Sequence, residues 1–293
     1  MGLNRLEVAR GLRISTWEAV WATVWATLTT GAFQTGFALY LGATPFWLGL
    51  LAGLPAAVGL LQIPASLVSE RQTTRKRFVA VAALTGRLLW VPILLLPFVL
   101  PRGAALPVFI FLLAASSALL TITVPAWTSW MSDLVPADNR GRYFAQRNML
   151  AGVVTMLVPL PAGAFLDQAV KYGRFDPRWG FGVLFGLAAL AAIVGATFLL
   201  RQPEPPVAPR DPSNPLRSLT QPLRDANFRR FLVFAGLLVV GQALAAQFFI
   251  AWQVGDEGLN LPYLTVQVLA AFASGAGLGA TLLWGYLADK YGS

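Results

Sequence analysis

Residues 285–293 read GYLADKYGS and continue directly from an apolar run over residues 262–287. A membrane-spanning helix needs about 20 mostly apolar residues, and this run is long enough. The segment is therefore interpreted as a charged, glycine-bearing turn at the point where a helix leaves a membrane. Its charged residues are Asp289 and Lys290, and glycines stand at 285 and 292.

The composition of the whole chain favours the same environment. Of its 293 residues, 56% are hydrophobic and 12% are charged, whereas ordinary soluble domains carry about 25% charged residues. These proportions indicate a polytopic membrane protein. The chain has no cysteine and no histidine, which excludes disulfides, thiolate metal sites and the most common metal ligand. We expect neither a metal site nor a cofactor.

Eight stretches are long and apolar enough to be spanning helices. They cover residues 17–41, 45–69, 78–100, 104–131, 148–169, 179–200, 229–253 and 262–287. The runs are continuous rather than alternating, which favours helices over membrane strands. The predicted fold class is an all-α polytopic membrane protein.

The basic residues of the loops orient the predicted helices. If the N-terminus is cytoplasmic, seventeen Lys and Arg residues fall on the cytoplasmic side, four fall on the opposite side, and Arg87 lies within a helix. Cytoplasmic loops carry such an excess, so the N-terminus is predicted to be cytoplasmic, in the cell (inner) membrane. The same bias explains the net charge of +9, so membrane lipids and not nucleic acid are the expected partners. No small-residue cleavage site follows the first basic residues, so no signal peptide is predicted.

One connection differs in kind from the others. Seven of the 20 prolines fall between residues 201 and 228, and such a segment is stiff and extended. We therefore expect three parts: a six-helix bundle over 1–202, a proline-rich cytoplasmic linker over 203–228, and the first two helices of a second bundle over 229–293.

The terminal motif has a weaker copy earlier in the chain. Aligning Asp289 with Glu70 places residues 285–293 over residues 66–74, with acid on acid and Lys290 on Arg71. Upstream of each copy, an apolar helix bearing glycines follows a short loop and another apolar helix. Internal repeats of this kind are expected in secondary transporters.

Three features together resemble the major facilitator superfamily of transporters. They are the Gly-x-Leu-Ala-Asp-Lys-x-Gly motif at 285–292, the six-plus-two layout with its central linker, and the loop over 127–148. That loop contains Arg140, Gly141, Arg142 and Arg147, in the Pro-x-x-x-Arg-Gly-Arg pattern found after helix 4 in many bacterial members. The resemblance implies two six-helix bundles and alternating access, and by comparison this chain is expected to be truncated after helix 8. The copy at 66–74 lacks the usual glycines.

The same resemblance suggests a role for Asp289. Helix 5 is expected to start near Asp138 as its N-cap, and its first turns carry Arg140, Arg142 and Arg147. Cations at a helix start are unfavourable, by about 0.3–1 kcal/mol each. In the family, helix 8 packs against helix 5, so Asp289 is expected to reach Asn148, Arg147 or Arg142 and latch the inner side closed. The alternative is a loop charge without a fixed partner.

Three charged residues lie inside predicted helices or at their ends. Arg87 is an intramembrane cation, which is a functional hypothesis by default. It could bind an anionic substrate, but we favour a structural role such as pairing with Glu18. Glu18 is a candidate proton carrier or an interfacial acid at a helix start. Asp167 ends helix 5 on the outer side and is expected to be solvated.

Polar and aromatic side chains on the helices that normally line the family's cavity form a candidate substrate site, for which helix packing is the alternative at each position. They include Gln34, Gln62, Trp127, Gln242 and Gln247. This set is amphipathic and low in charge, which favours a small neutral or amphipathic solute. The segment 159–163 faintly resembles the family's antiporter motif and weakly favours efflux in exchange for protons.

The favoured function is secondary active transport of a small molecule by alternating access. An enzyme is disfavoured because the chain offers no constellation of residues that chemistry needs. The remaining alternative is a truncated, non-transporting fragment or membrane scaffold, because helices that complete the family's cavity would be absent. The sequence leaves open the solute, the direction of transport, the coupling ion and the oligomeric state.

Overall fold

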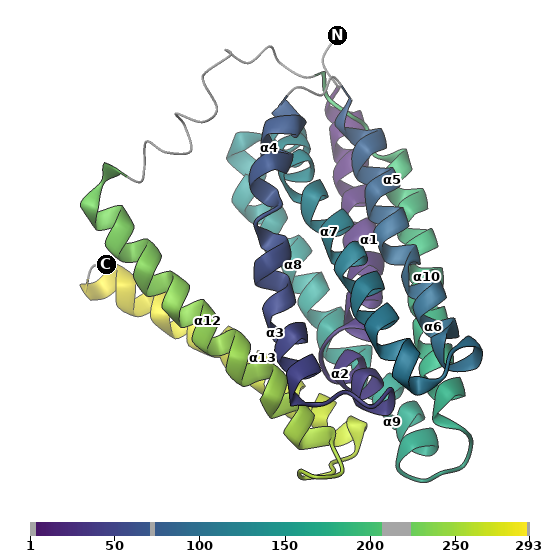
Figure 1. Ribbon diagram of the computed structural model, residues 1–293. Coiled ribbons are helices and arrows are strands. Elements are labelled where there is room, and N and C mark those ends of the chain that lie inside the picture. The colour runs from purple at the N-terminus through teal and green to yellow at the C-terminus, as the bar shows by residue number, and fades with distance from the viewer. Residues whose placement is uncertain (1–3, 71–73, 207–223, 292–293) are drawn as a thin grey trace.

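The computed structural model describes residues 4–70, 74–206 and 224–291, while the side chains of residues 69–70, 102, 244, 278–279 and 281–291 lie outside that description (Figure 1). Every regular element among the described residues is helical, in agreement with the predicted class. The bundle contains, in chain order, α1 (Arg5–Thr29), α2 (Gly31–Tyr40), α3 (Pro45–Gly59), α4 (Gln62–Glu70), α5 (Arg75–Leu88), α6 (Trp90–Val99), α7 (Arg102–Leu134), the 3-10 turn η1 (Ala137–Asn139), α8 (Arg140–Leu157), α9 (Pro159–Val170) and α10 (Pro177–Arg201). After the linker come α12 (Ala226–Val254) and α13 (Tyr263–Tyr291).

Each of the eight predicted helices is present, but four of them are divided in two. Three divisions lie four residues before a proline: α3 gives way at Leu60 before Pro64, α5 ends at Leu88 before Pro92, and α8 ends at Leu157 before Pro161. Proline has no N–H and its ring clashes with the carbonyl four residues earlier, so the helix is interrupted there. The fourth division, between α1 and α2, falls at Gly31, whose φ of +61° suits glycine.

Six described helical segments are long and apolar enough to cross a membrane, by length and composition. They correspond to the second through the seventh of the predicted stretches. The first stretch, which the structure divides into α1 and α2 at Thr30 and Gly31, is not among them. At the start of the last stretch, Tyr263–Gly277 forms a shorter apolar helix.

The two ends of the molecule differ in the segments that they gather. We call one end, with residue 4, residue 74, residues 136–139 and residues 201–206, the linker end, and the opposite end, with residues 41–44, 100–101, 171–176 and 255–262, the far end. The core of the bundle contains a cluster of aromatic rings. These rings come from helices that are distant in the sequence. Phe37 lies between 5.1 and 5.3 Å, centroid to centroid, from Phe109, Phe181 and Phe185.

The pair α12–α13 meets the bundle at the far end and leans away from it toward the linker end (Figure 1). The burial of α12 follows the same gradient: its described side chains from Ala226 to Gln242 are almost all exposed, whereas Ala251, Gln253 and Val254 are buried. On α13, Tyr263 and Val266 are buried and the residues after Gln267 are largely exposed. The contact between the two bodies is therefore concentrated at one end.

The start of the linker is attached to the bundle. The Glu204 carboxylate accepts hydrogen bonds from the backbone N–H groups of Arg75 and Lys76, at the start of α5. The indole N–H of Trp130 donates to the Pro203 carbonyl at 3.1 Å. Carboxylates are favourable at helix N-termini, so residues 203–204 belong structurally to the bundle. Residues 207–223 of the predicted linker lie outside the described residues.

Candidate functional site

A cavity of about 340 Å³ opens between α1 and α7 inside the bundle. We call it the charged cleft, because Glu18 of α1, Arg87 of α5 and Arg147 of α8 all line it. Two indole rings, of Trp25 and Trp127, form part of its walls. The helices that supply these side chains lie far apart in sequence, and the bundle brings their charges together.

Glu18 and Arg87 form the tightest pair in the charged cleft. The Arg87 Nη2 donates to Glu18 Oε1 at 3.1 Å, and the side chains are 11% and 5% exposed, respectively. The Trp25 indole N–H donates to the Arg87 backbone carbonyl at 3.3 Å, which links α1 to α5 a second time. The pairing of Arg87 with Glu18 that the sequence suggested is thus present in the structure.

Arg147 approaches the same carboxylate less closely. Its Nη2 lies 3.6 Å from Glu18 Oε2, and its side chain is 16% exposed. This separation is too long for a hydrogen bond. The guanidinium lies instead over the Trp127 ring, 4.7 Å from the ring centroid, within the range of a cation–π interaction. The sequence suggested Asp289 as a partner of Arg147 and did not suggest Glu18.

The charges of the cleft do not balance. Two guanidinium groups face one carboxylate, and the Nε atoms of Arg87 and Arg147 are buried without a hydrogen-bond partner among the described residues. Each guanidinium offers five N–H donors, more than one carboxylate can accept from both. The cleft therefore holds an excess of positive charge and of donors.

A second polar cluster joins α9 to α13 at the far end. Asp167, near the end of α9, is 2% exposed. Its two carboxylate oxygens accept hydrogen bonds from the backbone N–H groups of Tyr263 at 2.6 Å and Leu264 at 2.9 Å. These donors are the first residues of α13, whose N–H groups have no partner within the helix. The expectation that Asp167 is solvated was wrong, because α13 begins directly against it.

Lys171 completes this cluster one turn later. Its ammonium donates to the Val254 carbonyl at 3.2 Å, at the end of α12, and to the Asn260 side chain. Burial lowers the pKa of Lys171, and the carboxylates of Asp256 and Asp167 oppose that shift. We call Asp167 and Lys171, with their contacts on residues 254–264, the far-end clasp. An anion thus meets a helix start and a cation meets a helix end, as helix dipoles favour.

The backbones approach closely behind the far-end clasp. A Cβ atom at Gly163 of α9 would lie 3.0 Å from the backbone of Tyr263 and Leu264, and one at Gly36 of α2 would overlap the Tyr263 hydroxyl. The Tyr263 ring is stacked on Phe33, with centroids 6.3 Å apart. The absence of a side chain at positions 36 and 163 is what lets α13 seat against the bundle.

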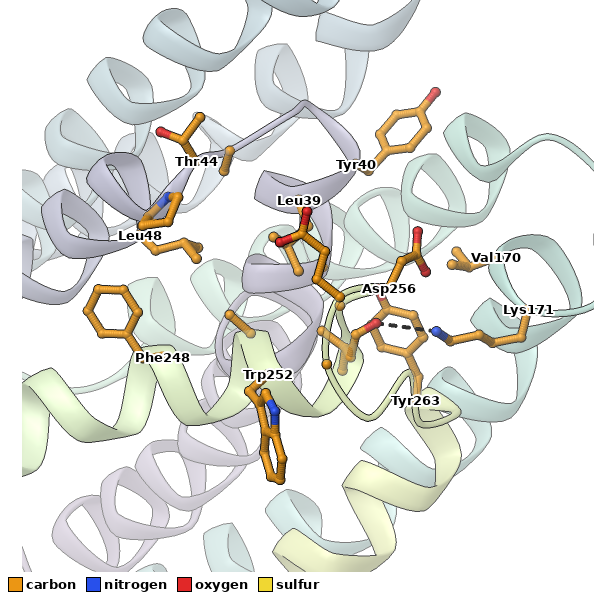
Figure 2. Close-up of a pocket in the computed structure, with 18 of the residues that line it drawn as sticks. Leu39, Tyr40, Thr44, Leu48, Val170, Lys171, Phe248, Trp252, Asp256 and Tyr263 are labelled. Carbon is orange, nitrogen blue, oxygen red and sulfur yellow. Dashed lines mark hydrogen bonds between the residues drawn. The ribbon is translucent and has the colours of Figure 1, made fainter.

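A wider cavity of about 690 Å³ lies beside the clasp (Figure 2). Figure 2 shows Lys171 and Tyr263 on one side of it and Phe248 and Trp252 of α12 on the other. Asp256 and Glu257, from the connection between α12 and α13, also line it. The cavity is bounded by both bodies, so its shape depends on their relative position.

The five predicted cavity residues do not surround one common space. Trp127 lines the charged cleft and Gln242 lines an open apolar patch on α12. The Gln247 amide donates to the Thr35 hydroxyl at 2.9 Å, so it connects α12 to α2, which is the helix-packing alternative. Gln34 is half-buried and Gln62 is exposed.

The motif residues are placed only in part. Arg140 donates to the Ser132 carbonyl at 2.8 Å, and Gly141 and Arg142 are exposed. The predicted helix 5 begins as α8 at Arg140, with Asn139 as its N-cap. The predicted cap, Asp138, lies in η1 instead. Arg71 and Gly292 lie outside the described residues, and at Glu70, Gly285, Asp289 and Lys290 only the helical backbone is described. The proposed contact of Asp289 with the start of α8 stays a prediction.

The all-helical fold, with six described segments that are long and apolar enough to cross a membrane, defines a multi-pass membrane protein. The sequence pattern of the Major Facilitator Superfamily matches residues 19–293, and the chain belongs to that family. Members of the family are transporters, which supports the interpretation that this chain is not an enzyme.

A solved structure has a similar fold. It is described as a bacterial homologue of the human drug peptide transporters PepT1 and PepT2. The TM-score is 0.54 at 12% sequence identity, and the match covers 94% of this chain and 57% of that chain. The present chain therefore spans a little over half of the length of that transporter, and the likeness concerns the fold alone. The comparison with curated proteins found no match.

Proposed function

We propose that the protein is a secondary active transporter that works by alternating access. The observation that supports this most directly is the one-ended contact between the bundle and α12–α13, with the far-end clasp at that end and exposed side chains toward the other. Alternating access requires two bodies that close at one end and part at the other around a site between them.

The charge distribution supports an assignment of the two ends. If the basic linker end is cytoplasmic, the arrangement described above corresponds to an inward-facing state closed at the outer surface. The far-end clasp is then the outer gate. Its partners at α13 are backbone groups, which water can satisfy when the gate opens. In the opposite state, Asp289 would reach the start of α8 and close the inner side.

Of the two solute classes that the sequence favoured, the amphipathic one agrees better with the walls of the cavities. The charged cleft joins two indoles to three charged groups, and the wider cavity joins Phe248 and Trp252 to Lys171 and Asp256. We propose export in exchange for protons as the mode of coupling. The antiporter-like segment 159–163 and the buried carboxylate of Glu18 support it.

The gating step can be tested with pairs of spin labels, because the chain contains no cysteine. Labels at Thr44→Cys and Leu259→Cys report the far end, and labels at Ala137→Cys and Asn227→Cys report the linker end, all at exposed positions. In lipid nanodiscs we expect a short distance at the far end and a long one at the linker end. The D167N variant should lengthen the first and shorten the second.

Transport itself is tested with the full chain in proteoliposomes. Flux of radiolabelled 3-phenylpropionate and of glucose is measured with and without a pH gradient, so that an amphipathic and a polar neutral solute are compared. We expect 3-phenylpropionate to move, and a pH gradient to accelerate it. Unchanged label distances in D167N together with no flux of either solute would contradict the proposed function.

A further inference from the structure

The charged cleft carries one more positive charge than its described side chains neutralise. Among the described residues, Glu18 is the one carboxylate that lines the cleft, whereas Arg87 and Arg147 both line it and both are largely buried. A charge at membrane depth is costly unless it is paired. A bundle that needed only a structural ion pair would be served by one arginine, so the second requires another explanation.

The two arginines are not equivalent. Arg87 is hydrogen-bonded to Glu18 at 3.1 Å and lies beside Gly195 of α10. Arg147 lies 3.6 Å from the same carboxylate, without a hydrogen bond, and its side chain is the more exposed of the two. Arg147 is therefore the one whose donors are available to an incoming group, while Arg87 holds Glu18 in place.

The walls of the cleft suggest what the incoming group carries. Beside Arg147, the cleft is lined by the indoles of Trp25 and Trp127 and by apolar side chains such as Leu120 and Val124. A volume of about 340 Å³ lies in the range of small-molecule sites. The excess charge is one, which a carboxylate neutralises, whereas a phosphate monoester brings a charge of about −1.5 to −2.

We propose that the charged cleft is a binding site for a small organic monocarboxylate with an apolar or aromatic body. The Arg147 guanidinium binds the carboxylate with the parallel N–H donors at its edge, its face lies on the Trp127 ring, and the Glu18–Arg87 pair positions the site. Such a monocarboxylate would be the amphipathic solute of the proposed transporter, so the site's role in transport rests on the proposed function. Binding is measured without flux, so the two can fail separately.

The test uses the full chain in detergent and three probes of equal shape: 3-phenylpropionate, its neutral amide and 3-phenylpropylamine. Binding is followed by calorimetry and by quenching of tryptophan fluorescence. The wild-type protein should bind the carboxylate about 10- to 100-fold more tightly than the amide, because a charge-assisted hydrogen bond is lost in the amide. The amine should bind least.

The decisive variant is R147Q, with R142Q as its matched control. Arg142 lies on the same helix but is exposed outside the cleft. R147Q should bind carboxylate and amide equally, and R142Q should keep the wild-type preference. If R147Q does not fold, R147K replaces it, and loss of one hydrogen bond of the guanidinium fork should weaken carboxylate binding by about fivefold. Equal binding of carboxylate and amide by the wild type, no binding of any probe, or an unchanged preference in R147Q and R147K would overturn the proposal.

Discussion

The charged cleft and the far-end clasp both bury ionised groups, but they satisfy them in opposite ways. In the cleft, Glu18, Arg87 and Arg147 face one another across helices of a single bundle, and one cation is left over. In the clasp, Asp167 and Lys171 of the bundle meet backbone groups at the ends of α13 and α12. Leftover charge suits a site that receives a ligand. Backbone partners suit a contact that opens, because water replaces them.

The largest expected effect comes from removing the shared anion of the cleft. The E18Q variant leaves two buried guanidiniums without a carboxylate, and breaking a buried ion pair in this way costs about 3–5 kcal/mol. We expect a fall of that size in the unfolding free energy, measured in mixed detergent micelles. D138N, at an exposed acid in η1, is the control. If E18Q and D138N had the same unfolding free energy, Glu18 would not neutralise the buried arginines, and the charged cleft would not differ from the far-end clasp as described.

The next effect is expected at the clasp, where the charge is lost but no buried ion is stranded. In D167N one carboxylate oxygen becomes an amide N–H that faces a backbone N–H. Hydrogen bonds to charged groups contribute about 1.5–3 kcal/mol. The free energy for local opening of the start of α13 should therefore fall by about that amount. Hydrogen exchange at the Tyr263 and Leu264 amides measures it. Protection equal to that of the wild type would show that Asp167 does not hold α13.

A purely steric change should separate the two regions further. In G163A the new methyl group meets the backbone of Tyr263 and Leu264 at 3.0 Å, and overpacking of this kind costs about 1–3 kcal/mol. The far-end label distance should lengthen while probe binding in the cleft stays unchanged. G152A on α8, where a Cβ would meet nothing within 4 Å, is the control. Equal shifts in both variants would remove the steric explanation.

The smallest effect is expected from the ring under Arg147. W127L removes the cation–π contact seen at 4.7 Å, which contributes about 0.5–2 kcal/mol. We expect weaker binding of 3-phenylpropionate and little change in the clasp. W17L, at an exposed tryptophan of α1, should leave both unchanged. A W127L protein that binds like W17L would assign Trp127 to packing alone.

Local patterns predicted the helices better than they predicted the sites. Long apolar runs located all eight helices, and the rule for proline explains breaks such as that at Leu88 before Pro92. The pair of Glu18 and Arg87 could be suggested because each is an ion within an apolar run. Asp167 also lies at the end of such a run, but nothing in the sequence indicated its partner Tyr263, which is 96 residues away. The position of Arg147 beside Glu18 likewise depends on how α1 and α8 pack.

The close contact at Gly163 has a mechanical consequence. Because no side chain separates α9 from α13 there, the contact can serve as the fulcrum of a lever whose arm is α13. A helix of 29 residues is about 43 Å long at 1.5 Å per residue. A tilt of about 10° around the fulcrum would then move the other end of the arm by about 7 Å. Small angular adjustments beside the far-end clasp would thus become displacements at the linker end as large as a side chain.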